Sequence, residues 1–285
     1  MSDRLATILA SLGNRWPVAT GPGWAVVKGD CLDVMAAMPD KCVEHFVSDP
    51  PYDDRTHNAV RVNATGYVEV ESSRRAAISR NLDLGFDALT RDQMVASAKH
   101  MARLVARWSL AFCSVEMVSD WRESLNSAGI EYLRACVWNR LNGTPQFTGD
   151  RPASAVEAIV CAHRRGRKRW NAGGKRGIYS HPIVLNRGAG EDRVHTTQKP
   201  IGLMVEILAD FTDPGDLVLD AFAGSATTGI ACLRLGRQFI GIERDPAYFE
   251  IACRRMRGDE AKPRPEQPSI FDLIPAATAR AKETP

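Results

Sequence analysis

The chain has 285 residues, of which 44% are hydrophobic and 25% charged, a composition typical of a soluble globular protein with one substantial core. Residues 1–20 contain no apolar run of signal-peptide length, and no segment approaches the ~20 apolar residues of a membrane span, so we expect a cytoplasmic protein with no membrane partner. The seven cysteines are odd in number and include no Cys-x-x-Cys pair, which favours reduced thiols over a disulfide framework or metal site.

The formal net charge of +3 is unevenly distributed along the chain. Residues 139–193 carry eleven of the 37 Lys and Arg but only four of the 34 Asp and Glu, so the remainder is net negative. One basic block on a mildly acidic protein indicates a polyanionic partner. A solvated surface loop is the alternative explanation.

The first elements predicted by periodicity and breakers are a helix at 2–12, a strand at 24–30, a helix at 31–38 and a strand at 43–47. Asp30 stands at the carboxyl end of its strand, where open α/β sheets bind ligands. It is equally suited to cap the following helix.

The strand at 43–47 runs into Ser48-Asp49-Pro50-Pro51-Tyr52. Neither proline has a backbone N–H, and Pro51 holds Pro50 extended, so both carbonyls remain acceptors beside a carboxylate and an aromatic ring. Such a cluster suits a planar group with an exocyclic amine, whose N–H groups bind the acceptors while Tyr52 stacks on its face. The alternative is a Pro-Pro turn with Tyr52 capping the core.

The next segment, 53–87, is polar, carries six Arg or His residues and has no sustained periodicity, which favours a lid or binding loop. Beyond it we predict a helix from Thr90 to about Arg107, a strand at 109–115, a helix at 117–128 and a strand at 132–138. This alternation predicts an α/β fold with a mostly parallel sheet and helices on both faces.

The basic block interrupts the alternation. A strand at 155–162 fits the pattern, but 163–177 is glycine-punctuated and basic, and forms neither an amphipathic helix nor a core strand. With Trp170 among its charges, it is typical of a flexible surface that wraps nucleic acid.

The last third of the chain holds two further site candidates. His195-Thr196-Thr197-Gln198-Lys199-Pro200 precedes a helix at 201–211, and it suits either an anion or carboxylate site or plain capping. A strand from Leu217 to Asp220 then enters a small-residue turn and a helix through Leu235, followed by a strand at 238–243. Its last residue, Glu243, is placed to hold ribose hydroxyls, while the missing G-x-G-x-x-G disfavours a dinucleotide.

Together, Asp49-Pro50-Pro51-Tyr52, His195 to Pro200 and Asp220-Ala221-Phe222-Ala223-Gly224-Ser225 resemble the β class of amino-directed DNA methyltransferases. In that class the catalytic motif comes first, target recognition second and the cofactor loop last. The resemblance covers roughly Val26 to Met256. Thr196 departs from it, because the family commonly has proline there.

The resemblance implies a Rossmann-like methyltransferase fold, S-adenosylmethionine as cofactor and double-stranded DNA as substrate. It implies that Asp49 and the Pro50 carbonyl hold the target amine while Tyr52 stacks on a flipped-out base, with Pro51 completing the catalytic motif. Residues implied in cofactor binding are Asp30, Cys31, Asp49, His195, Thr197, Gln198, Lys199, Asp220, Phe222, Ala223, Gly224, Ser225, Thr227 and Glu243. From the basic block we expect phosphate contacts by Arg164, Arg165, Arg167, Lys168, Arg169, Lys175 and Arg176.

Asp rather than Ser before Pro50 favours adenine N6 over cytosine N4 as the target within this family. An RNA methyltransferase and a non-catalytic DNA-binding regulator remain as alternatives. The expected divisions are a catalytic part at 1–138, with its loop at 53–88, a target-recognition region at 139–193, a cofactor part at 194–257 and a Pro-rich tail at 258–285. The resemblance makes a homodimer reasonable. In the tail, Gln267 to Phe271 resembles peptides that dock on the bacterial sliding clamp, with docking on its own core or a dimer partner as the alternative.

Overall fold

The structure is a computed structural model, in which the described residues are 3–52, 65–68, 76–79, 88–143, 145, 150, 152–184 and 198–259. Among these residues no helix is both long and apolar enough to cross a membrane. The expected sliding-clamp peptide, Gln267 to Phe271, lies outside the described residues.

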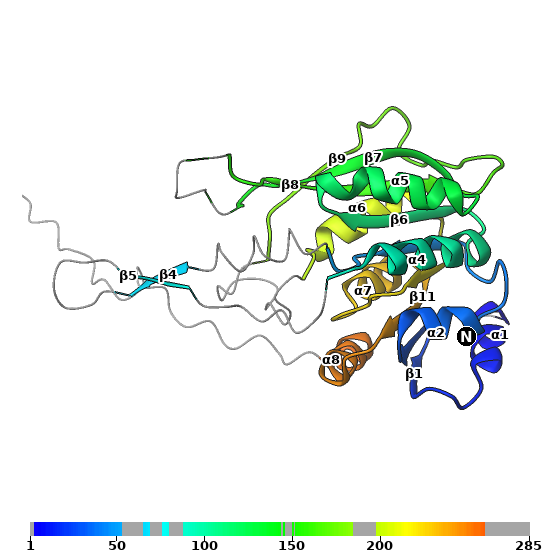
Figure 1. Ribbon diagram of the computed structural model, residues 1–285. Coiled ribbons are helices and arrows are strands. Elements are labelled where there is room, and N and C mark those ends of the chain that lie inside the picture. The colour runs from blue at the N-terminus through cyan, green and yellow to red at the C-terminus, as the bar shows by residue number, and fades with distance from the viewer. Residues whose placement is uncertain are drawn as a thin grey trace, which may run out of the picture.

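One large mixed sheet forms the centre of the molecule (Figure 1). Its strands are β1 (Val18–Gly21), β2 (Trp24–Lys28), β3 (His45–Ser48), β6 (Trp108–Cys113), β7 (Glu131–Arg140), β8 (Val156–His163), β9 (Ile178–His181), β10 (Leu217–Asp220) and β11 (Gln238–Glu243). They lie in the order β1-β2-β11-β10-β3-β6-β8-β7-β9, and the five from β2 to β6 are mutually parallel. The mostly parallel α/β sheet expected from the sequence is confirmed.

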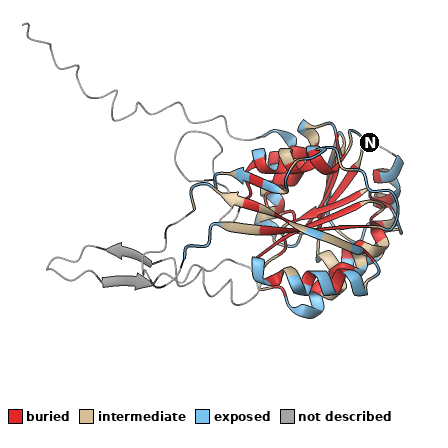
Figure 2. Ribbon diagram, turned by 90° about the horizontal axis from the view of Figure 1, so that it is seen from above, coloured by how far each residue is buried: buried red, intermediate tan, exposed pale blue. Residues whose placement is uncertain are grey.

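Helices cover both faces of this sheet. They are α1 (Asp3–Leu12), α2 (Cys31–Ala37), α4 (Arg91–Leu104), α5 (Val118–Ser127), α6 (Ile201–Phe211), α7 (Thr227–Arg234) and α8 (Pro246–Arg257), with a 3-10 turn η1 (Val115–Met117) before α5. α1, α2, α4 and α5 share one apolar cluster with the sheet, and α6, α7 and α8 share the other. Figure 2 shows the buried strands between the two helical layers.

The strand residues alternate between the two clusters, because successive side chains of a strand point to opposite faces. Phe46 of β3 packs into the first cluster and Val47 into the second. Since both faces are covered, all four residues of β3 are buried. The burial includes two polar side chains of β3, His45 and Ser48.

The chain turns in opposite directions from two adjacent strands, β3 and β10. From β3 it crosses through α4 to β6 on one side, and from β10 it crosses through α7 to β11 on the other. Open α/β sheets bind ligands outside the carboxyl ends of strands at such a switch point. Asp49 follows β3 and Phe222 to Ser225 follow β10, so both sequence motifs lie there.

Several elements differ from the sequence prediction. β1 pairs antiparallel with β2 across the Gly21 to Gly23 break and was not expected. The segment predicted to be irregular at 53–87 contains β4 (Thr65–Val68) and β5 (Ala76–Ser79), which pair antiparallel. Residues 178–181 of the expected recognition region form β9 of the central sheet, which was not expected, whereas the strand expected at 155–162 is present as β8. These differences share one cause, because each depends on pairing with another strand and not on local periodicity.

Candidate active site

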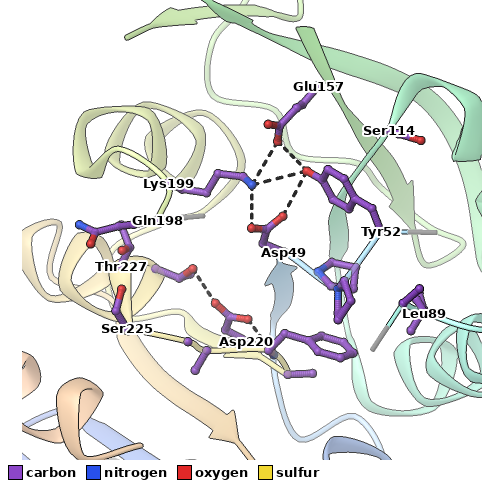
Figure 3. Close-up of a pocket in the computed structure, with 18 of the residues that line it drawn as sticks. Asp49, Tyr52, Leu89, Ser114, Glu157, Gln198, Lys199, Asp220, Ser225 and Thr227 are labelled. Carbon is purple, nitrogen blue, oxygen red and sulfur yellow. Dashed lines mark hydrogen bonds and ion pairs between the residues drawn. The ribbon is translucent and has the colours of Figure 1, made fainter. Parts of the chain in front are cut away.

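Asp49 and Tyr52 lie in the turn that leaves β3 at the carboxyl edge of the sheet (Figure 3). The Tyr52 hydroxyl lies 3.3 Å from Asp49 Oδ1. Its ring packs against the first apolar cluster, and its backbone carbonyl accepts a hydrogen bond from the Leu89 amide at 3.2 Å. The turn is therefore held at both its side chains and its backbone.

Lys199 and Glu157 meet this turn from two other elements. The Lys199 ammonium, just before α6, lies 2.6 Å from Asp49 Oδ2 and 3.1 Å from Glu157 Oε2. Glu157 Oε2 also accepts the Tyr52 hydroxyl at 2.5 Å, while Arg140 lies 3.4 Å from Oε1. The rings of Tyr52, Phe112 and Trp138 surround the ammonium at 5.1–5.6 Å. Two carboxylates thus share one buried cation.

The charges of this cluster shift one another's protonation. Burial raises the pKa of Asp49 above its usual value, although Lys199 opposes the shift. Burial acts the same way on Glu157, but there Lys199, the Tyr52 hydrogen bond and Arg140 together hold the pKa below its usual value. Burial would lower the pKa of Lys199, yet Asp49 and Glu157 raise it. Lys199 is therefore charged at neutral pH, and Glu157 loses its proton more readily than Asp49 does.

Asp220 ends β10 beside the catalytic turn. Its Oδ1 accepts the Ser48 hydroxyl at 2.5 Å and the Phe222 amide at 3.1 Å, and its Oδ2 accepts the Thr228 hydroxyl at 2.6 Å. Burial raises the pKa of Asp220 to about 6, although these hydrogen bonds oppose the shift. Its carboxylate thus organises the turn between β10 and α7.

Glu243 and Asp30 end the two neighbouring strands. Glu243 Oε2 accepts the Gly224 amide and Oε1 the Asp245 amide, each at 2.8 Å. Each oxygen keeps a lone pair for a further donor. Asp30 caps α2, because its Oδ1 accepts the Leu32 amide at 2.9 Å. The capping alternative for Asp30 is therefore confirmed. Asp30 also lines a large cavity at this edge of the sheet.

Arg255 of α8 anchors the small-residue turn after β10. Its guanidinium donates to the Ser225 backbone oxygen at 2.6 Å, to Ser225 Oγ at 2.8 Å and to Thr227 Oγ1 at 3.3 Å. Gly224 and Ala226 both adopt positive φ, +51° and +59°, so the turn is sharp. The buried Arg255 guanidinium thus stabilises the turn between β10 and α7.

A single cavity of about 1650 Å³ joins these groups. A pocket for one small ligand has roughly 300–1,000 Å³, so this cavity has room for a cofactor and a base together. The expected site residues that line it are Asp30, Cys31, Asp49, Pro50, Pro51, Tyr52, Gln198, Lys199, Asp220, Phe222, Ala223, Gly224, Ser225, Thr227 and Glu243. His195 and Thr197 lie outside the described residues.

Two residues of the site were missed by sequence reasoning, Glu157 and Arg255. Glu157 is the second residue of β8, which runs antiparallel to β6 and β7, so the start of this strand lies at the edge where its neighbours end. The available signal was a lone acid in an otherwise apolar strand. Arg255 sits on a helix that the sequence analysis did not predict, among other basic residues that hid it.

The residues of the basic block that were expected to contact DNA do not line the cavity. Arg164 to Arg169 follow β8 at the opposite edge of the sheet, because His163 pairs with Trp108 at the start of β6. The six residue-to-residue steps from Glu157 to His163 span roughly 20 Å of strand. At that edge Lys168 lies 2.9 Å from Glu131 and Arg169 lies 3.1 Å from Asp213.

The remaining part of the block is also tied to the protein. Lys175 lies 2.5 Å from Asp210 and 2.7 Å from Glu206, both on α6. The Trp170 ring packs edge-on against Phe211 with centroids 4.8 Å apart. Arg165, Arg167 and Arg176 are exposed. Acids and an aromatic ring distant in sequence thus hold parts of this segment against the fold, while its phosphate contacts stay a prediction.

Comparisons with known proteins show what the chain is similar to. A family model described as DNA methylase, of the N6/N4 methyltransferase type, matches residues 43–254. The type II methyltransferase M.HinfI of Haemophilus influenzae is 24% identical over 87% of this chain and 72% of its own length. The structure of an M1.HpyAVI-SAM complex aligns with TM-score 0.57 and 24% identity, over 81% of this chain and 99% of that one. The cytosine-N4-specific PvuII DNA methyltransferase aligns with TM-score 0.65 and 15% identity, over 87% and 92%.

Proposed function

The chain belongs to the DNA methylase family of amino-directed methyltransferases, and on that premise we propose that it methylates the exocyclic N6 of a flipped-out adenine in duplex DNA. The observation that supports this reaction is the meeting of Asp49, Pro50 and Tyr52 with the turn after β10 in one cavity. Methyl transfer between two bound molecules requires both of them at one place, and this cavity has the room.

The methyl donor is S-adenosylmethionine, and the residues present suit it. Glu243 retains acceptor capacity at both oxygens for ribose hydroxyls, and Phe222 offers an apolar face beside it. The turn at Gly224 has no side chain to obstruct a ligand. When bound, S-adenosylmethionine supplies an electrophilic methyl group on a sulfonium sulfur.

The work of the protein is to bring the target amine to that methyl group. The Asp49 carboxylate and the Pro50 carbonyl accept the two N–H groups, which favours a pyramidal nitrogen with an available lone pair. Tyr52 stacks on the base and fixes its plane. No covalent enzyme intermediate is needed, because positioning and electrostatics assist direct transfer.

Adenine is the first choice of base because an Asp, and not a Ser, precedes Pro50. Cytosine N4 is the alternative within the same family, since it presents an equivalent exocyclic amine to the same acceptors. Both targets place the same demands on Asp49 and Tyr52. The choice between them therefore needs a product analysis.

The test is transfer of tritiated methyl groups from S-adenosylmethionine to unmethylated duplex DNA, followed by nucleoside digestion and mass analysis. We expect N6-methyladenine from the wild type, and a loss on the order of 10²–10³ in rate for Asp49→Ala, because an acceptor of the reacting amine is removed. The exposed Asp40→Ala is the matched control. N4-methylcytosine would move the assignment to cytosine, and labelled RNA with unlabelled DNA would overturn it.

A further inference from the structure

Lys199 is ion-paired with Asp49, the carboxylate that accepts the target amine in the proposed reaction. Its ammonium lies 2.6 Å from Asp49 Oδ2, closer than to Glu157 Oε2 at 3.1 Å. A carboxylate oxygen that is paired with an ammonium has less capacity to accept from a neutral amine. A target amine that donates to Oδ2 therefore competes with the ammonium for this oxygen.

The surroundings limit where that charge can go. The Lys199 side chain is only 9% exposed and is enclosed by the rings of Tyr52, Phe112 and Trp138. A buried ammonium that loses its partner without gaining another is strongly destabilised. Among the described residues, Asp49 and Glu157 are the carboxylates that contact it.

Glu157 is prepared to receive the charge. Its side chain is 13% exposed, and Arg140 and the Tyr52 hydroxyl already orient both of its oxygens. Because Glu157 Oε2 contacts both Lys199 and Tyr52, the two groups that border Asp49 are held by one atom (Figure 3). A small rotation of the Lys199 chain is enough to move the ammonium from one carboxylate towards the other.

We propose that Glu157 is a positioning residue for methyl transfer, which takes the Lys199 ammonium from Asp49 as the target base enters and keeps the Tyr52 ring in its stacking orientation. This inference rests on the proposed function, since it assigns a role at the same site. Glu157 acts through Lys199 and Tyr52 and does not contact the reacting atoms.

The pH dependence of the reaction follows from the same contacts. The charged and titratable groups that interact with Asp49 and Glu157 are Lys199, Tyr52, Arg140, Cys113 and Asp220, and Glu116 interacts in turn with Cys113. The negative charge of Glu157 raises the pKa of Asp49. Removing it therefore lowers that pKa and moves the acid limb of kcat/KM to lower pH, since Asp49 acts in its ionised form.

The experiment compares wild type, Glu157→Gln and Glu157→Asp in methyl transfer to duplex DNA between about pH 5 and pH 9. For Glu157→Gln we expect kcat to fall on the order of 100-fold, because the acceptor geometry is disturbed at the reacting amine. The acid limb moves to lower pH. Glu157→Asp keeps the charge, so it should retain the wild-type limb and recover part of kcat.

A second measurement does not depend on turnover. Calorimetric titration with S-adenosylhomocysteine should give a Kd for Glu157→Gln within about twofold of wild type, because Glu157 lies on the base side of the cavity. The matched control is Glu131→Gln, which removes an ion-paired carboxylate from the adjacent strand at the far edge of the sheet. It should leave kcat, KM and Kd unchanged.

Each outcome of these experiments either supports or overturns the positioning role of Glu157. Unchanged kcat in Glu157→Gln, a fall in kcat with an unmoved acid limb, or a large loss of S-adenosylhomocysteine affinity would each overturn the positioning role. If Glu157→Gln does not fold, a wild-type-like acid limb with partial kcat in Glu157→Asp supports the role, and a moved limb overturns it. Failure of the proposed function is distinct, because wild type itself would then label no DNA.

Discussion

Ser48 and Asp220, 172 residues apart, are joined by a hydrogen bond of 2.5 Å from Ser48 Oγ to Asp220 Oδ1. It connects the last residue of β3 to the last residue of β10, immediately beside the catalytic turn. The Phe222 amide donates to the same two oxygens, at 3.2 Å and 3.1 Å. These hydrogen bonds fix the turn after β3 relative to the turn after β10.

Ser48→Ala should lower the free energy of unfolding by about 1–3 kcal/mol, because Asp220 loses a buried donor. Ser109→Ala is the matched control, since Ser109 is buried on adjacent β6 and its hydroxyl has no hydrogen-bond partner among the described residues. Its removal should cost much less. Urea unfolding monitored by circular dichroism gives both values, and equal losses would contradict the role of the Ser48 bond.

Asp220 should make the stability of the ligand-free protein fall as pH rises. Burial raises its pKa from 3.8 to about 6, so its favourable contribution is complete below about pH 4 and is lost as pH rises through 6. Asp220→Asn removes this titration. Relative to wild type, the variant should gain on the order of 3 kcal/mol between pH 4 and pH 7.5.

The measurement is urea unfolding of both proteins at these two pH values, with Asp40→Asn as the control for loss of an exposed carboxylate. A wild-type to Asp220→Asn difference that does not change with pH would show that Asp220 is not the titrating group.

Arg255→Lys should weaken cofactor binding about tenfold, because lysine keeps the charge but its ammonium ends about one bond short of the Nη1 atom that donates to Ser225 and Thr227. The same change on exposed Arg254, one residue earlier on α8, is the control and should have no effect. Calorimetric titration with S-adenosylmethionine measures both. Wild-type affinity in Arg255→Lys would mean that the turn keeps its shape without the guanidinium.

Replacing Arg165 and Arg167 together by Gln should leave DNA affinity within about twofold and the salt dependence of binding unchanged. Both lie at the edge of the sheet opposite the cavity, roughly 20 Å of strand from Glu157. Filter binding of duplex DNA over a range of salt concentrations tests this. A decrease of about two in the salt slope would instead place these arginines on phosphates, as the charge pattern alone suggested.

Elements and motifs with local signals could be predicted from the amino-acid sequence. Periodicity predicted α4 with its capping box, and the Thr90 and Gln93 side chains form that box in the structure. The apolar runs predicted β3 and β10, and the residues after them were expected to form the site. Because parallel strands end at one edge of a sheet, such residues meet whenever their strands are neighbours.

The groups that complete the site from distant parts of the chain could not be predicted in this way, because strand pairing brings them together. Glu157 reaches Lys199 because β8 enters the sheet antiparallel, and strand direction depends on non-local pairing that periodicity does not encode. Likewise, the basic run after His163 lies away from the cavity because β8 carries it to the far edge, where Glu131 and Asp213 neutralise two of its charges. Charge counts along a chain give the sign of a surface, but its position is set by the packing of strands beneath it.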